Sequence, residues 1–268
     1  MSVFDNAKSE SDRLSLPAMQ LVRSEGNQFS RIGGVPLVPP GFSWPIWMHE
    51  PLAFLAQLDL TEVAAAFVQP WMPATGQLYF FYDKEQSTWG FDPADRGSWK
   101  VIYSDVAIAD LRVAEVPVGI GPEHLYNNVH LTGRKILSRP DCQRLQVDTS
   151  QTTNQEFEEV IEMSLAPFGN LPIHQLFGLP IPVQGDHMEL ECQLASNGIY
   201  CGTPEGYDSP QAAQLAPGAE EWRLLLQLDS DDEAGMMWGD AGTLYFWVLE
   251  ADARKADFTN VWMILQCG

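Results

Sequence analysis

The 268-residue sequence has few basic residues, few cysteines and no long apolar run. Fifteen Lys and Arg oppose 36 Asp and Glu, so the formal net charge is 15 − 36 = −21. Nucleic acids and anionic membranes require a basic footprint, so we exclude both as partners. No apolar stretch approaches the roughly 20 residues of a membrane-spanning helix. The first residues lack the basic start and apolar middle of a signal peptide, so we expect a cytoplasmic protein.

The chain contains four cysteines: Cys142, Cys192, Cys201 and Cys267. They are too few for a disulfide framework and form no C-x-x-C pair, so we expect free thiols that are mostly buried. Two of them, with His174 and His187, offer ligand types that suit zinc. Their spacings match no compact zinc knuckle, and we therefore predict neither a metal nor a cofactor.

Motifs that would indicate an enzyme are also missing. The sequence has no G-x-S-x-G nucleophile elbow, no H-E-x-x-H, no P-loop and no G-x-G-x-x-G after a strand. Carboxylate pairs exist at Glu158-Glu159 and Glu189/Glu191, but the first pair lies on the solvated face of a predicted helix. A glycosidase needs two carboxylates that converge from different segments, which the sequence alone cannot establish. These absences favour a protein that is not an enzyme.

What the sequence does contain is an internal repeat. AFLAQLD at residues 53–59 corresponds to RLLLQLD at 223–229, and GQLYFF at 76–81 corresponds to GTLYFW at 242–247. Within L-x-Q-L-D and G-x-L-Y-F, eight of ten positions are identical. Two copies are too few for a solenoid, so the repeat predicts a duplication with two pseudo-symmetric halves.

The halves extend over about residues 30–115 and 170–268, and residues 116–169 join them within a single domain of residues 1–268. Each Q-L-D segment alternates along the chain, which predicts a strand with one apolar face, and the G-x-L-Y-F segments are apolar on both faces, as in central strands. Helices are expected to be few and short, as listed here: Asp59–Ala66 with a capping box, Asn154–Leu165, Ser209–Leu215 and Ala251–Asp257. We predict an α+β fold, mostly antiparallel sheet.

Polar residues repeat with the strands and suggest a binding site at the junction of the halves. The two copies carry equivalent pairs, and further polar residues lie near the turn of the second copy, as listed: Gln57, Asp59, His174, Gln184, Asp186, Gln227 and Asp229. Ligand pockets favour such junctions. The alternative is that Gln and Asp bind backbone groups at strand ends or cap the next element, since a duplication readily preserves architecture.

An acidic loop and several tryptophans leave further alternatives open. The run Asp229–Glu233 has alternating carboxylates that resemble a calcium loop, but Ala234 stands where such a loop needs glycine, which favours a solvated acidic loop. Tryptophans lie near the stiff proline-rich segment 33–45, namely Trp44, Trp47 and Trp71. They either line a groove for a ligand or cover the margin of the core.

With these motifs in place, the chain resembles the YwqG-like family, bacterial proteins defined as a domain of unknown function. The likeness is carried by Gly33-Gly-Val-Pro36, Leu55-Ala-Gln-Leu-Asp59, Gly76-Gln-Leu-Tyr-Phe-Phe81, His174-Gln-Leu-Phe-Gly-Leu-Pro180, Gln184-Gly-Asp186, Leu226-Gln-Leu-Asp-Ser230, Trp238-Gly-Asp-Ala-Gly242 and Phe258-Thr-Asn-Val-Trp262. The resemblance implies one internally duplicated α+β unit in a cytosolic protein. It implies no reaction and assigns no functional residues.

Two functions follow as hypotheses. The first is a non-catalytic interaction module that binds a basic protein through its acidic face, because complementary charge speeds such encounters. The second is a small-molecule-binding protein or hydrolase with a site between the two halves. Ligand, partner and oligomeric state are not determined by the sequence.

Overall fold

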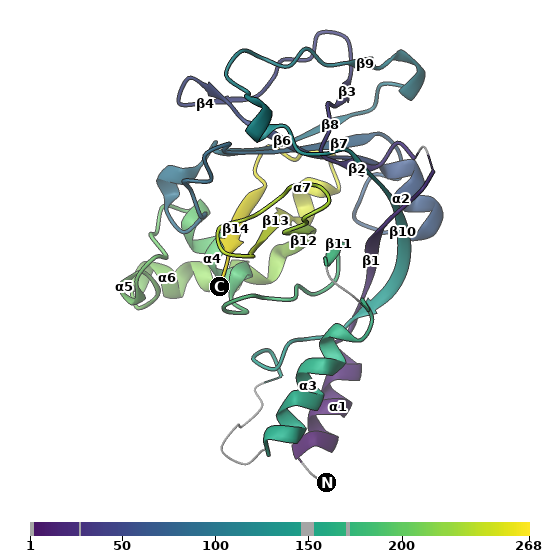
Figure 1. The fold of residues 1–268 in the computed structure, drawn as a ribbon. Helices are drawn as coiled ribbons and strands as arrows, with labels where there is room; N and C mark the ends of the chain where they lie inside the picture. Colours follow the sequence, from purple (N-terminus) through teal and green to yellow (C-terminus); the bar gives the residue numbers. More distant parts are fainter. Residues whose placement is uncertain (1–2, 27, 146–152, 170–171) are drawn as a thin grey trace.

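A computed structural model of the protein describes residues 3–26, 28–145, 153–169 and 172–268. Ten strands form one antiparallel sheet in the order β14-β13-β12-β11-β1-β10-β2-β6-β7-β8, and two small two-stranded sheets, β3–β9 and β4–β5, lie apart from it. The sheet curls until its two ends face one another, which gives a nearly closed, barrel-like body (Figure 1). Within the described residues, none of the helices combines the length and apolar character needed to cross a membrane. The predicted α+β fold, mostly antiparallel with short helices, is confirmed.

The strands are β1 Leu16–Arg23, β2 Arg31–Ile32, β3 Leu37–Val38, β4 Ile46–Trp47, β5 Glu50–Pro51, β6 Ala53–Asp59, β7 Gln77–Tyr82, β8 Trp99–Ser104, β9 Arg112–Val113, β10 Val129–Ser138, β11 His174–Leu176, β12 Trp222–Asp229, β13 Thr243–Leu249 and β14 Trp262–Gln266. The α-helices are α1 Val3–Leu14, α2 Leu60–Ala66, α3 Asn154–Leu165, α4 Met188–Ser196, α5 Pro204–Tyr207, α6 Pro210–Leu215 and α7 Glu250–Ala253.

The repeated motifs form the two ends of the sheet, β6–β7–β8 and β12–β13–β14. Gln57 pairs with Tyr79 across β6 and β7, as Gln227 pairs with Tyr245 across β12 and β13. In both pairs the register shifts at the leucine two residues before the glutamine, which marks a β-bulge at the same position of each motif. The origin of this likeness by duplication stays a prediction.

The prediction that the Q-L-D strands have one apolar face on the core was too simple. All seven residues of β6 are buried, because the outer face of β6 and β7 carries a second small core. Phe54, Tyr79 and Phe81 belong to that core, and Trp44 and Trp47 pack against it. The bulge also interrupts strict alternation along the strand. For β7, burial on both faces is confirmed.

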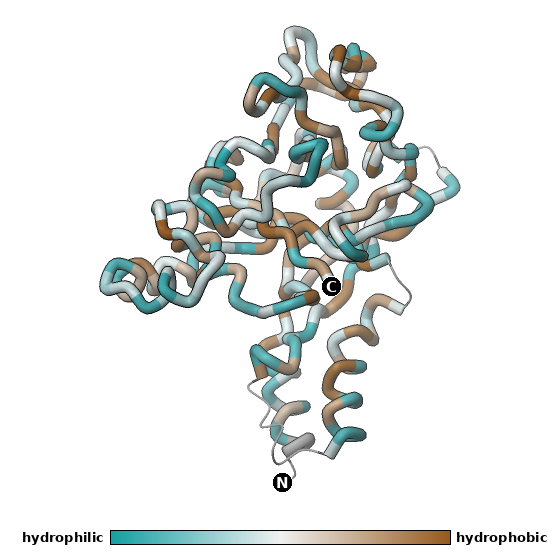
Figure 2. Tube along the Cα trace, turned by 60° about the vertical axis from the view of Figure 1, so that its left-hand side comes forward, coloured by the Kyte–Doolittle hydropathy of each residue, from teal (hydrophilic) through white to brown (hydrophobic). Residues whose placement is uncertain are grey.

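The two ends of the sheet pack against each other to form the main core. Phe80 of β7 meets Phe246 of β13 with ring centroids 5.2 Å apart, and Trp99 of β8 meets Trp262 of β14 at 4.9 Å. Each tryptophan also donates its indole N–H to the backbone of the opposite half, both at 2.8 Å. Figure 2 shows hydrophobic segments gathered in the centre of this body. Contact between the two ends therefore closes the barrel.

The strands in the middle of the sheet come from outside the repeated motifs. β1 and β10 pair over eight residues from Leu16↔Ser138 to Arg23↔Leu131, and β10 belongs to the segment expected only to join the halves. Helices α1 and α3 contact each other and extend from one end of these long strands, away from the barrel (Figure 1). The start of β1 and the turn after β10 both border the site described below.

The predicted helices form with small changes at their ends. α3 has the predicted bounds, and α6 begins after the N-cap Ser209, whereas the last helix is short and ends at Ala253. Asp59 caps α2 through Thr61 N at 2.8 Å, as expected. The capping box is incomplete, because the Glu62 carboxylate instead accepts hydrogen bonds from Phe29 and Ser30.

Candidate functional site

The repeated glutamines are buried and bind backbone groups. Gln57 Oε1 accepts from Leu37 N at 2.7 Å, and Gln227 Oε1 accepts from Ile181 N at 2.9 Å. Each side-chain amide also donates to a backbone carbonyl, at 3.4 and 3.3 Å respectively. These contacts attach the loop after β2 or β11 to the sheet, which matches the architectural alternative considered for these residues.

The repeated aspartates occupy strand ends. Besides the cap made by Asp59, Asp229 accepts from Ile173 N at 2.8 Å and from Thr243 Oγ1 at 2.9 Å. Asp229 thereby links the entry of β11 to β13. None of the four repeated residues lines the groove described below.

His174 belongs to a buried Asp–His pair that the acidic loop provides. Its Nδ1 accepts from Asp229 N at 3.1 Å, so Nε2 carries the proton that is donated to Asp231 at 3.2 Å. Burial raises the pKa of Asp231, but hydrogen bonds from His174 and Ala234 and the charge of Arg23 outweigh it and lower that pKa to about 2. Since both ring nitrogens are occupied, His174 has no free position for acid–base work.

Asp231 and Glu233 of the acidic loop are engaged within the protein. Asp231 accepts from Arg23 at 2.5 Å and from two backbone N–H groups of its own loop, and Glu233 pairs with Arg23 at 2.8 Å. Among the described residues, no group of three or more His, Cys, Asp or Glu side chains is placed to hold a metal ion. All four cysteines are free and three are buried, which confirms the expected free thiols.

Gln184 and Asp186 lie in the turn that leads into α4. Gln184 donates to Cys267 O at 2.9 Å and stays within the structural network at the end of β14. Asp186 points toward a pocket and is held by Arg144. Of the seven predicted binding residues, Asp186 is the one that lines this pocket.

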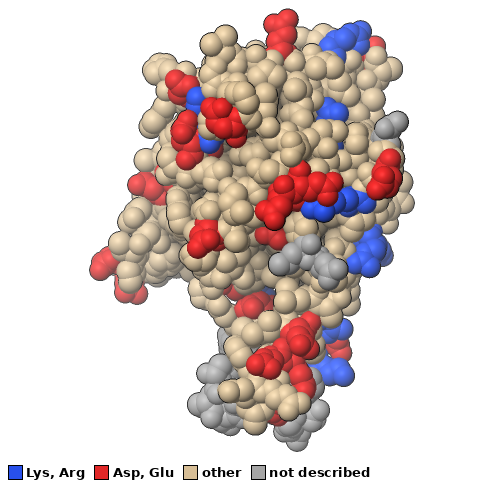
Figure 3. Space-filling model, viewed as in Figure 1, with Lys and Arg blue, Asp and Glu red and all other residues tan. Residues whose placement is uncertain are grey.

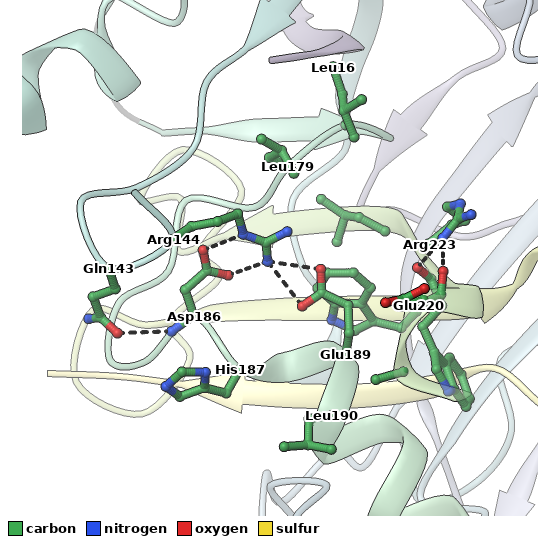
Figure 4. A pocket seen from close by; sticks show the side chains of 15 residues that line it. Leu16, Gln143, Arg144, Leu179, Asp186, His187, Glu189, Leu190, Glu220 and Arg223 are labelled. Carbon is green, nitrogen blue, oxygen red and sulfur yellow. Dashed lines mark hydrogen bonds and ion pairs between the residues drawn. The ribbon is translucent and has the colours of Figure 1, made fainter. Parts of the chain in front are cut away.

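The pocket has a volume of about 550 Å³ and lies between the starts of β1 and β12, the turn after β11 and the start of α4 (Figure 4). Aliphatic and aromatic side chains form most of its wall, with charged groups from two sides. Its lining comprises Leu16, Gln143, Arg144, Gly178, Leu179, Asp186, His187, Glu189, Leu190, Ala219, Glu220, Trp222, Arg223, Leu224 and Trp247. An apolar wall with a few convergent polar groups is typical of a small-molecule site.

A second pocket of about 410 Å³ adjoins the first. The two share part of their lining: Leu16, Gly178, Arg223 and Leu224. The second pocket adds the segment 67–71 from the first half, including Trp71, so that the two together run between the halves. We call the two adjoining pockets the groove. Of the three tryptophans considered at the sequence level, Trp71 lines the groove, whereas Trp44 and Trp47 pack on the second core.

Arg144 provides the strongest polar contacts of the groove. Its Nε and Nη2 bind the two Asp186 oxygens at 2.7 and 2.6 Å, and Nη2 also binds Glu189 at 2.8 and 3.0 Å. Burial alone would lower the pKa of Arg144. The hydrogen bonds and charges of the two carboxylates have the larger effect and raise this pKa above its ordinary value, so the guanidinium stays charged. At the other side Arg223 binds Glu250 at 2.9 Å. The sequence did not indicate Arg144, because its partners lie 42 and 45 residues away along the chain.

Two tryptophans of the groove differ in how their indole N–H groups are satisfied. Trp222 donates to Gln193 Oε1 at 2.9 Å. Trp247 is 1% exposed, and its buried Nε1 has no acceptor among the described residues. A buried donor without a partner costs about 1–3 kcal/mol. Buried donors without an acceptor are uncommon in folded proteins.

The lining also limits the chemistry of the groove. Neither pocket is lined by a Ser, Thr or Cys from the described part of the chain, so the described lining offers no side-chain hydroxyl or thiol as a nucleophile. His187 and the carboxylates line the wall, but Asp186 and Glu189 are engaged by Arg144. The arrangement is suited to binding.

Behind the groove, α4 carries a buried carboxyl group, Glu191. Burial raises the pKa of Glu191 to about 7, the hydrogen bond from Tyr207 lowers it, and the charges of Glu189 and Asp186 raise it. Oε2 of Glu191 has no partner among the described residues, and Tyr207 Oη donates to Oε1 at 3.4 Å. The group therefore titrates near neutral pH inside the protein.

Comparison with known proteins assigns residues 30–267 to the model of a family described as a domain of unknown function, DUF1963. A search of curated proteins finds no match. The match agrees with the expected domain of unknown function, while the name YwqG-like stays a prediction. It covers both copies of the repeat, and the groove residue Leu16 precedes it.

Proposed function

The chain belongs to DUF1963, a family defined as a domain of unknown function. We therefore propose a function from the geometry of the groove. The function is the non-catalytic binding of a small organic molecule with an apolar body. The observation that carries the proposal is that two pockets of about 550 and 410 Å³ adjoin and share four residues. Pockets of 300–1,000 Å³ with mostly apolar walls are those that bury drug-sized ligands.

The location of the groove supports the second hypothesis in a modified form. Segment 67–71 of the first half and Gly178 and the start of β12 of the second half line the groove, which supports a binding site between the halves. The repeated Gln and Asp residues serve the scaffold, and the polar groups of the site come instead from Arg144, Asp186, Glu189 and Arg223. The missing nucleophile favours binding over hydrolysis.

The test is a fragment screen by ligand-observed NMR with a matched pair of variants. Leu16 and Leu137 are similarly exposed, at 44% and 45%, on the neighbouring strands β1 and β10, but of the two only Leu16 lines the groove. Leu16→Trp fills the groove and should abolish binding of apolar fragments, whereas Leu137→Trp should leave it unchanged. Fragment binding that survives Leu16→Trp, or an absence of any saturable binding, refutes the proposal.

A second candidate function, the interaction module for a basic protein, is favoured by the charge. With 36 acidic and 15 basic residues, at least 36 − 15 = 21 carboxylates have no one-to-one basic counterpart. Acidic side chains occur over much of the face in Figure 3, and several of its basic groups lie beside them. We expect a basic partner captured at low salt and released at high salt. Failure to capture a partner at low salt contradicts this candidate.

A further inference from the structure

Tyr207 of α5 lies within hydrogen-bond reach of two acceptors but carries one proton to donate. Its hydroxyl oxygen is 3.0 Å from Cys201 O and 3.4 Å from Oε1 of Glu191 on α4. The nearer carbonyl oxygen forms the stronger bond with this proton. A protonated Glu191 removes the competition, because its own O–H donates to Tyr207 Oη while Tyr207 donates to Cys201 O. The geometry between α4 and α5 therefore fits the protonated form of Glu191.

An ionised Glu191 has no comparable partners. The side chain is 8% exposed, and its Oε2 is buried without a donor among the described residues. The neighbouring carboxylates of Asp186 and Glu189 disfavour a further negative charge. The thiols of Cys192 and Cys201 are neutral, because burial raises the pKa of both. Ionisation in place thus leaves a buried charge that is poorly compensated.

The elements that pack on α4 bring no free cation to Glu191 in the described part of the chain. β14 and α6 contain no charged residue, and the 3₁₀ helix Ala216–Glu221 adds two exposed carboxylates. β12 contributes Asp229 and Arg223, and Arg223 is bound by a glutamate of α7. Arg144 is held by the two carboxylates at the start of α4, and Arg96 donates to the last carbonyl of α4.

The part of the chain that carries Tyr207 is weakly anchored. We call residues 201–207, which end with α5, the α5 segment. Of these residues only Cys201 is fully buried, and the others are exposed or partly buried. The segment lies at the outer margin of the molecule (Figure 1). Segments with few buried contacts open locally at a lower free-energy cost than the whole fold.

We propose that Glu191 and Tyr207 form a proton-dependent latch, in which protonated Glu191 holds the α5 segment against α4 and loss of this proton releases it. Once the segment has moved away, the Glu191 carboxylate reaches water, which stabilises its charge. The neighbouring residues Glu189 and Leu190 line the groove, so the latch lies directly behind that site. The latch needs no ligand, and it can fail or hold independently of the proposed function.

Hydrogen–deuterium exchange at pH 6 and pH 8, corrected for the intrinsic pH dependence of exchange, tests the latch. The amides of Cys201 and Gly206 report on it, because they donate to Phe91 O at 2.8 Å and to Thr203 O at 3.2 Å. The pKa of Glu191 is about 7 in the closed protein, against an ordinary 4.5. The opening equilibrium should therefore rise about tenfold from pH 6 to pH 8, and the protection of residues 199–209 should fall by the same factor.

Two pairs of variants separate the roles of the carboxyl and the hydroxyl. Glu191→Gln keeps a donor for Tyr207 at both pH values, so its protection should not change between them, whereas the exposed Glu205→Gln should behave as the wild type. Tyr207→Phe removes the hydroxyl and should lower protection about fivefold already at pH 6. Tyr200→Phe removes a hydroxyl from a side chain that is 48% exposed and should have no such effect.

Exchange of β13, in the centre of the fold, provides the reference for global unfolding. If residues 199–209 are protected as strongly as β13, they open only with the whole fold and the latch does not exist. A tenfold change that persists in Glu191→Gln also overturns the proposal, as does an equal effect of Tyr200→Phe and Tyr207→Phe. Circular dichroism checks that each variant folds, and the comparison of wild type with Glu191→Gln decides the question if Tyr207→Phe does not fold.

Discussion

Glu191 makes the stability of this protein depend on pH in an unusual direction. Its pKa is about 7 in the folded protein, against the ordinary 4.5 for the unfolded chain. At about 1.4 kcal/mol per tenfold change in proton affinity, ionised Glu191 destabilises the folded state by about 3 kcal/mol. The folded protein holds this proton more tightly, so the associated stability is present below pH 4.5 and is lost as the pH rises through about 7.

Glu191→Gln mimics the protonated acid at every pH. We expect the variant to match the wild type near pH 4.5 and to exceed its free energy of unfolding by about 3 kcal/mol at pH 8. For a chain of this size that difference corresponds to roughly 5 °C in melting temperature. Urea unfolding at both pH values measures it directly.

The control for this prediction is Glu158→Gln, on the exposed side of α3. Removing an exposed carboxylate should change stability by less than about 0.5 kcal/mol and with little dependence on pH. If Glu191→Gln and the wild type differ by the same amount at pH 4.5 and pH 8, the carboxyl does not titrate near neutrality and the reasoning is wrong.

Three further predictions concern the scaffold. Asp231→Asn should lower the free energy of unfolding by about 2 kcal/mol at pH 7, because the carboxyl has a pKa near 2 in the folded protein against an ordinary 3.8. In urea unfolding, the difference from the wild type should vanish as the pH falls from 4 to 2. Gly90→Ala should destabilise the fold by more than 3 kcal/mol, because the new Cβ would lie 1.8 Å from Met263 O. Gly41→Ala is the control: Gly41 has a similar positive φ but open space around it, so this change should destabilise the fold by about 1–2 kcal/mol. Trp262→Phe should cost about 1–2 kcal/mol in the same assay, since it leaves Gly90 O without its indole donor; an unchanged stability would show that this contact contributes nothing.

The helices and strands were predicted from local sequence patterns. Their predicted ends lay close to the observed ends where the pattern extended over the whole element. Apolar residues at helical spacing predicted α3 with its observed ends, and the structure adds a capping box of Thr153 and Glu156 at its start. β10 was missed although it crosses the middle of the sheet, because its exposure changes irregularly along the strand and leaves no clear two-residue period. The strand is specified by its long pairing with β1, which is a tertiary property.

The candidate site was less predictable than the fold. Asp186 was named from the sequence and lines the groove, but its partner Arg144 comes from the segment between the halves. No spacing rule links two residues on separate loops, since only the closed sheet brings them together. The repeated Gln57 and Gln227 were the more conspicuous candidates in the sequence. In the structure their side chains attach loops to the sheet through backbone hydrogen bonds.

The closing of the sheet has a consequence for the exposure of its two outermost strands. The outermost strands β8 and β14 would each offer unpaired backbone groups to another molecule, which invites edge-to-edge aggregation. Here the Leu265 N–H of β14 is taken by Trp89 O at 3.0 Å, and Trp99 and Trp262 reach across to the opposing backbone. Each outer strand thus helps to shield the other. Loss of β14 by proteolysis would therefore expose two strand edges at once, those of β13 and β8.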